Sequence, residues 1–178
     1  MSQENETATP VQDQTIASGI YISVESRSKW VVGVQTPLAD NIALHTMACG
    51  DVNALLALID RARIKVAAAG VGAPSVVVCY EAGCEGFWLY RRLVGLGIRV
   101  VVIDPASLLV DSRAKRAKTD RIDARAMVRA LMAWARGERQ VLSEVRVPTV
   151  KQDDARRGLR ERHRLARERT AHGSRIKG

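Results

Sequence analysis

The sequence predicts an α/β fold, in which a mixed sheet is flanked by helices, on three observations. The chain has 178 residues, which suits one domain of ordinary size with an appendage, and 47% of them are hydrophobic. Phe occurs once, so the core must be aliphatic, and this favours a sheet covered by helices over an aromatic-rich β-sandwich. Short β-prone runs also alternate with segments of helical periodicity.

The first ordered elements are predicted to be three strands. Residues 1–18 are polar and lack apolar periodicity, which is typical of a disordered leader. Two β-prone runs follow at 20–25 and 30–34, separated by Ser-Arg-Ser-Lys, so we expect a hairpin. Residues 41–47 are predicted to form a third strand.

The next segments predict a strand, helix, strand unit. Residues 51–70 have helical spacing, with Asp as a cap and Gly as the stop. A buried parallel strand is predicted at 75–81, a helix at 87–94 and another buried strand at 98–103. This order puts Glu81 at the carboxyl end of its strand, which is the usual place for function in open α/β sheets.

Two acidic residues three positions apart, Asp120 and Asp123, are the most informative feature of the chain. A helix would stack both carboxylates on one face, and Thr119 before them is a suitable N-cap. The apolar spacing continues to about residue 136, so we expect the pair to open a helix. Such a face could hold a divalent metal ion.

The positive charge is concentrated in the second part of the chain. Residues 1–110 carry 8 Lys or Arg against 10 Asp or Glu, a charge of −2, whereas residues 111–178 carry 20 against 9, or +11. This asymmetry predicts binding of nucleic-acid phosphates, although a solvated charged helix or, less well, an anionic membrane would also fit. The residues expected to contact nucleic acid lie around the Asp pair: Arg113, Lys115, Arg116, Lys118, Arg121 and Arg125.

Both ends of the chain and its cysteines carry further expectations. Residues 149–178 are polar and helix-prone with few large apolar side chains, so this helix either needs a partner helix or nucleic acid or is frayed. Cys49, Cys79 and Cys84 lack metal-site spacing and are predicted to be small core residues. Neither a signal peptide nor a membrane span is indicated, so we expect a soluble cytoplasmic protein.

The proposed acids fit one known arrangement, the ribonuclease-H-like fold, in which acids at adjoining strand ends meet acids from a packed helix. Three motifs follow one another in the chain: Tyr80-Glu81-Ala82-Gly83, the strand end Val101–Pro105, and above all Lys118–Ala124. With these motifs the chain resembles the DEDD-type insertion-sequence transposases, whose amino-terminal domain is similar to the Holliday-junction resolvase RuvC. The resemblance covers roughly residues 19–178.

The resemblance implies four catalytic, metal-binding acids. Glu81, Asp120 and Asp123 match the E, D and D of the family, and Glu25 stands where the family has its first Asp. Four such carboxylates would hold Mg²⁺ or Mn²⁺ and support phosphodiester transfer. Glu25 as a turn acid, the Asp pair as a solvated helix face, and Asp104 as a rival ligand remain alternatives.

The resemblance also implies partners and further parts. Proteins of this family bind DNA, are guided by a structured RNA, work at the nucleoid, and carry a carboxy-terminal domain with a nucleophilic serine. The expected division is a leader at 1–18, a RuvC-like domain at 19–147 and the start of a basic coiled-coil helix at 149–178 that pairs subunits. The serine domain is outside these residues, so the chain resembles a fragment or a truncated copy. The alternative is a non-catalytic module that binds nucleic acid and dimerises.

Overall fold

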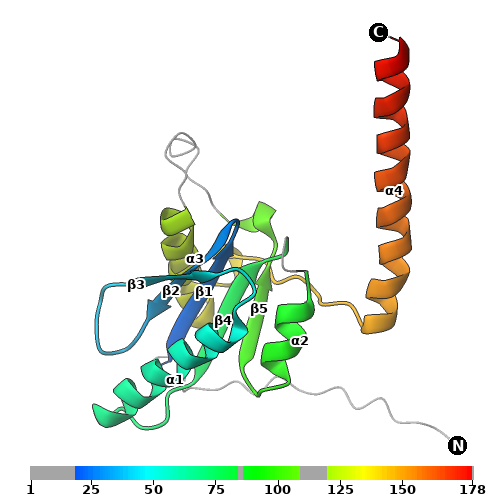
Figure 1. Ribbon diagram of the computed structural model, residues 1–178. Helices are drawn as coiled ribbons and strands as arrows, with labels where there is room; N and C mark the ends of the chain where they lie inside the picture. The colour runs from blue at the N-terminus through cyan, green and yellow to red at the C-terminus, as the bar shows by residue number, and fades with distance from the viewer. Residues whose placement is uncertain (1–18, 84–85, 109–119, 178) are drawn as a thin grey trace, which may run out of the picture. The chain divides into compact units, whose positions relative to one another are not determined.

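The computed structural model describes residues 19–83, 86–108 and 120–177 (Figure 1). The chain divides into two compact units, Met1–Val145 and Arg146–Gly178. Among the described residues, the first unit holds a sheet and three α-helices, and the second holds one long helix.

A five-stranded mixed sheet forms the centre of the first unit and confirms the predicted α/β class. Its strand order is β3-β2-β1-β4-β5, with β1–β2 and β2–β3 antiparallel and β1–β4 and β4–β5 parallel. The predicted hairpin is present, but its turn has two residues rather than four, because the two strands extend further. The strands are β1 (Ile20–Ser26), β2 (Lys29–Gln35), β3 (Ala43–Ala48), β4 (Val76–Glu81) and β5 (Arg99–Ile103).

Helices cover both faces of this sheet (Figure 1). One face carries α1 (Val52–Ala68) and α2 (Trp88–Val94), and the other carries α3 (Asp120–Ala135). The predicted cap of α1 is confirmed, since Oδ1 of Asp51 accepts a hydrogen bond from the amide of Ala54 at 2.9 Å. The described part of this unit also has the short 3₁₀ turns η2 (Pro105–Ser107) and η4 (Arg139–Val141).

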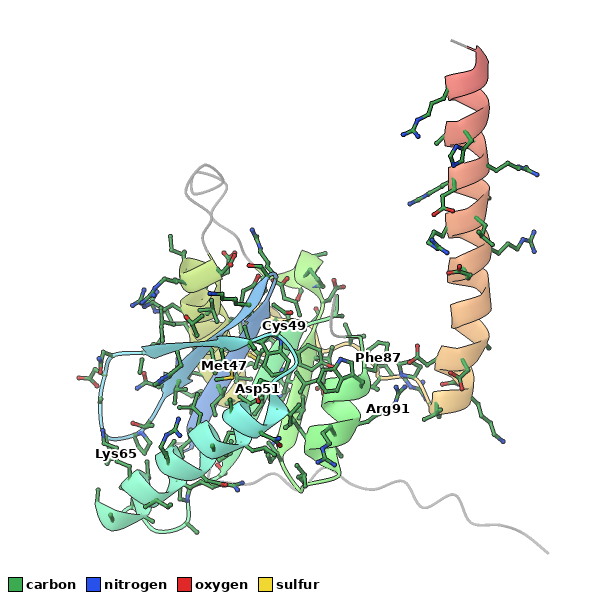
Figure 2. The ribbon with its side chains drawn as sticks, viewed as in Figure 1. Met47, Cys49, Asp51, Lys65, Phe87 and Arg91 are labelled. Carbon is green, nitrogen blue, oxygen red and sulfur yellow. The ribbon has the colours of Figure 1, made fainter. Side chains whose placement is uncertain are left out.

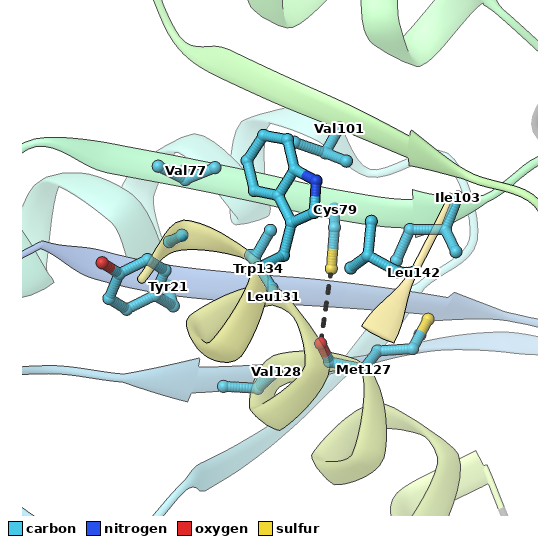
Figure 3. Close-up of a cluster of buried hydrophobic side chains, with 11 residues drawn as sticks. Tyr21, Val77, Cys79, Val101, Ile103, Met127, Val128, Leu131, Trp134 and Leu142 are labelled. Atoms are coloured by element: carbon cyan, nitrogen blue, oxygen red, sulfur yellow. Dashed lines mark hydrogen bonds between the residues drawn. The ribbon is translucent and has the colours of Figure 1, made fainter. Parts of the chain in front are cut away.

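The core between α3 and the sheet is mainly aliphatic, as the composition predicted, and includes the rings of Tyr21 and Trp134 (Figure 3). The guanidinium groups of Arg139 and Arg99 lie 4.2 Å and 5.4 Å from the centre of the Trp134 ring, so they cover it where it nears solvent. The buried members are Tyr21, Val77, Cys79, Val101, Ile103, Met127, Val128, Leu131, Trp134, Ala135 and Leu142.

The cysteine prediction is wrong at one position. Cys79 is fully buried, and its thiol contacts the carbonyl of Met127 at 3.9 Å. Cys49 is exposed instead, because it follows the edge strand β3, where one side of the strand has no neighbour. Cys84 lies outside the described residues.

The second unit is the helix α4 (Val150–Lys177). It begins with a reciprocal capping box: Oε1 of Gln152 accepts from the amide of Thr149 at 3.0 Å, and Oγ1 of Thr149 accepts from the amide of Gln152 at 3.3 Å. Arg164 bonds to Glu161 and Glu168 along the helix surface. Across the described ranges, no helix is long and apolar enough to cross a membrane.

Candidate functional site

Two glutamates lie side by side where the parallel strands β1 and β4 end. The register pairs Ser23 with Cys79, so Glu25 and Glu81, two residues further along each strand, are neighbours. Side chains alternate between the faces of a sheet, so both acids follow Ser23 and Cys79 on the face covered by α3. Glu25 is 7% exposed and Glu81 is half-buried. The structure therefore brings together the two strand acids that the sequence singled out.

A close approach of α3 to the sheet sets the position of the other two acids. Ser23 donates a hydrogen bond of 2.7 Å to the carbonyl of Ala124. Beside it on β2, a Cβ atom added to Gly33 would lie 2.8 Å from Oγ of Ser23 and 3.1 Å from the Ala124 carbonyl. Only glycine leaves room for this contact. The first turn of α3, with Asp120 and Asp123, is therefore held against the end of β1.

Arg27, in the two-residue turn between β1 and β2, lies among these acids. Its Nε is 3.1 Å from Oδ1 of Asp120 and 3.7 Å from Oε1 of Glu25, and its Nη2 is 3.9 Å from Oδ2 of Asp123. One guanidinium thus contacts carboxylates from a strand and from a helix far away in the sequence. The three carboxylates converge on a single positive charge.

The pKa of Glu25 is raised by burial of its carboxyl group and by neighbouring negative charges. Burial of its carboxyl, followed by the negative charges of Glu81 and Asp123, raises the pKa of Glu25 to about 7. Arg27 opposes this rise and Asp120 adds a smaller contribution to it. The site sets four carboxyl groups against one arginine, so a further cation would relieve the repulsion that raises the pKa of Glu25.

The donor atoms of these carboxylates suit a hard divalent cation. Carboxylate oxygens are the ligands that Mg²⁺ prefers, and these acids already share one positive charge. Within the described ranges, no three His, Cys, Asp or Glu side chains have the arrangement of a metal site. The positive charge beside Glu25, Asp120 and Asp123 is the guanidinium of Arg27, which lies within 3.9 Å of all three carboxylates.

The basic residues predicted to bind nucleic acid divide into two groups. Arg121 is exposed and Arg125 is half-buried, both on the amino-terminal half of α3 beside the Asp pair. The other four, Arg113, Lys115, Arg116 and Lys118, lie outside the described residues, as does the predicted cap Thr119. The rival acid Asp104 is exposed, and its Oδ1 accepts from the amide of Ala106 at 2.9 Å, which is a turn role.

Sequence reasoning missed three residues that shape the site. Arg27 was assigned only to the hairpin turn, although a cation two residues after Glu25 is a sequence signal for an ion pair with that acid. Gly33 inside a β-prone run indicates close approach of another backbone, which is its role here. Ser23 carried no signal, since its bond to α3 depends on the tertiary fold.

Comparison with known proteins places the chain beside bacterial transposases. It is 43% identical over 162 residues to "Putative transposase y4rJ" of Sinorhizobium fredii, covering 89% of this chain and 41% of that protein. It is 37% identical over 59 residues to the transposase for insertion sequence element IS1533 of Leptospira borgpetersenii, covering 33% of this chain and 17% of that protein. No family model matches the chain. The chain thus spans less than half the length of the relatives it matches.

Proposed function

We propose that this chain is the ribonuclease-H-like, DEDD-type domain of an insertion-sequence transposase, which binds DNA and performs metal-dependent phosphodiester transfer. The transposase names of its relatives support the general function. The mixed five-stranded sheet, flanked by helices, is compatible with the proposed fold. The motif resemblance at Glu81 and at the Asp pair supplies the finer assignment.

One observation carries the catalytic part of the proposal: a single guanidinium contacts acids from β1 and α3. The contacts of Arg27 with Glu25, Asp120 and Asp123 are all 3.9 Å or shorter. Glu81 lies beside Glu25 on the adjacent strand and raises its pKa. A structural role alone does not account for four acids at one edge, since their mutual repulsion costs stability.

In this proposal Glu25, Glu81, Asp120 and Asp123 hold Mg²⁺ or Mn²⁺. Two such ions can activate the attacking oxygen of a phosphodiester exchange and stabilise the leaving oxygen. Arg27 has to move aside, because its guanidinium contacts the carboxylates that would hold the metal. A bound metal ion would favour the ionised form of Glu25, whose carboxyl group would then lose its proton. Arg121 and Arg125, with the basic residues that precede α3, orient the phosphate backbone.

The proposal extends to the partners of the longer protein. A structured RNA would guide target choice, and a carboxy-terminal serine domain would complete strand exchange at the bacterial nucleoid. The strongly basic helix α4 would pair subunits. Its large apolar side chains are too few to form a core of their own, so they need a partner helix to be buried.

A nuclease assay on branched DNA with Mn²⁺ tests the catalytic proposal. We expect the chain to cleave the substrate and Glu81→Gln, which keeps the shape of the side chain, to lose the activity. Asp104→Asn is the matched control, because it also removes an acid after a neighbouring parallel strand and should retain activity. If wild type binds DNA without any cleavage, the chain is the alternative, a non-catalytic binding and dimerisation module.

A further inference from the structure

We propose a second nucleic-acid contact, a phosphate-binding cavity on the opposite face of the sheet from the acids. The cavity has a volume of about 350 Å³ and lies between α1, the edge strand β3 and the loop that connects β2 to β3. Figure 2 labels Lys65, which lies on α1 toward its carboxyl end and lines this cavity. Its lining is Val34, Thr36, Ala39, Asn41, Ala43, His45, Leu58, Arg61, Ala62 and Lys65.

The charges that line this cavity are of one sign. Arg61 and Lys65 lie one helical turn apart on α1, so both point to the same side, and His45 faces them from β3. No Asp or Glu is among the lining residues, and neither Arg61 nor Lys65 has an ion pair within the described part of the chain. The net charge of residues 1–110 is −2, so this is a local basic site in an acidic region.

The polar part of the lining includes groups that can bond to phosphate oxygens. The guanidinium of Arg61 offers paired donors and Lys65 offers an ammonium group, while Thr36 and Asn41 add a hydroxyl and an amide. The floor is apolar, from residues such as Leu58 and Val34. Buried apolar side chains beside exposed hydrogen-bond donors suit a sugar-phosphate unit.

The loop that lines the cavity is held in place before any ligand arrives. The side-chain amide of Gln35 donates to the carbonyls of Thr36 and Ala39, and the amide of Ala39 donates to the carbonyl of Thr36 at 3.3 Å. Gln35 itself is 8% exposed, so the clamp is largely shielded from water. A preformed loop lowers the ordering cost of binding.

This cavity and the acidic site are separate. His45 pairs with Val32 in the β2–β3 ladder, and Val34, the next residue on the same side of β2, lines the cavity. Glu25 pairs with Val31, whose side chain points to the other face. Anions drawn to the cavity are therefore on the α1 face, away from the repulsion of the α3 face.

The ligand that we infer is the phosphate backbone of DNA or RNA. This step depends on the proposed function, because a transposase domain has to grip nucleic acid beyond the reacting bond. Fluorescence anisotropy with a labelled duplex oligonucleotide, and with a single-stranded RNA, compares wild type with Arg61→Gln/Lys65→Gln. Loss of two phosphate contacts on duplex DNA should reduce the salt slope by about 1.8, which is roughly 60-fold in affinity at 0.1 M salt.

Arg63→Gln is the matched control, because Arg63 lies on the same helix, is paired with Asp60 at 3.8 Å and does not line the cavity. Equal losses in the control and in the double variant would overturn the proposal, as would an unchanged slope. Added inorganic phosphate should displace the oligonucleotide from wild type more than from the double variant. If inorganic phosphate instead binds only wild type without affecting oligonucleotide affinity, the cavity is a site for free phosphate and the inference fails.

Together with the nuclease assay, this binding experiment separates the inference from the proposed function. If wild type binds DNA and cleaves it while Arg61→Gln/Lys65→Gln behaves as wild type, the cavity proposal fails and the proposed function stands. If wild type binds neither DNA nor RNA, both fail. Thermal unfolding of the variants should match wild type, because Arg61 and Lys65 are exposed.

Discussion

Replacing Glu25 by Gln should stabilise the metal-free protein at high pH and have little effect at low pH. The folded protein raises the pKa of Glu25 from 4.5 to about 7, mainly because the carboxyl is buried. Below about pH 4.5 this carboxyl is protonated in both the folded and the unfolded chain. As the pH rises to 7 and above, the folded protein has to carry a buried negative charge, so stability is lost.

The pKa rise sets the size of the effect. A change from 4.5 to about 7 corresponds to roughly 3 kcal/mol of lost stability once Glu25 is fully ionised. Gln has nearly the same shape but cannot ionise, so Glu25→Gln should retain this free energy at pH 8. At pH 4.5 and below, where wild type is protonated too, the two proteins should be about equally stable.

Urea unfolding followed by circular dichroism, with EDTA present, measures this difference at pH 4.5 and pH 8. Asp60→Asn is a suitable control, because Asp60 is an exposed acid on the surface of α1 and should give no comparable pH-dependent gain. An equal stability difference between wild type and Glu25→Gln at both pH values would refute the argument, since the pKa of Glu25 would then be normal in the folded protein.

Three other substitutions test the packing and the charges around the site. Gly33→Ala should cost about 1–3 kcal/mol of unfolding free energy in urea, because its Cβ would collide with Ser23, and a wild-type midpoint would contradict the close approach of α3. Leu131→Ala should cost about 2–5 kcal/mol, since the side chain is fully buried, and a smaller loss would mean that α3 is loosely packed. Arg27→Gln should strengthen Mg²⁺ binding about fivefold in a calorimetric titration, because it removes a competing charge worth about 1 kcal/mol at 4 Å. Weaker Mg²⁺ binding by this variant would contradict the expectation and would mean that Arg27 helps to position the acids.

Local patterns explain why most of the fold could be predicted. Alternating or continuous apolar runs mark strands without knowledge of the rest of the chain, and Asp51 caps its helix through a bond that spans three residues. The parallel pairing of β4 with β5 followed from the helix between them. These features depend on neighbours in the sequence, so they are visible in it.

The parts that could not be predicted depend on contacts between distant residues. Arg27 contacts Asp120 only because α3 crosses the end of β1, and no spacing rule connects the two positions. Cys49 is exposed because β3 is an edge strand, and strand order is a property of the whole sheet. The grouping of Glu25 with Glu81 was predicted, but the pKa of Glu25 depends on burial that the sequence does not report.

Calorimetric titration of Mg²⁺ into wild type and into Asp120→Ala/Asp123→Ala tests the central claim most directly, because it asks whether the converging acids bind a metal ion. Circular dichroism would first establish that the double variant is folded, since both residues lie in the first turn of α3. We predict saturable binding to wild type that the double variant lacks. Indistinguishable titrations of the two proteins would contradict the account.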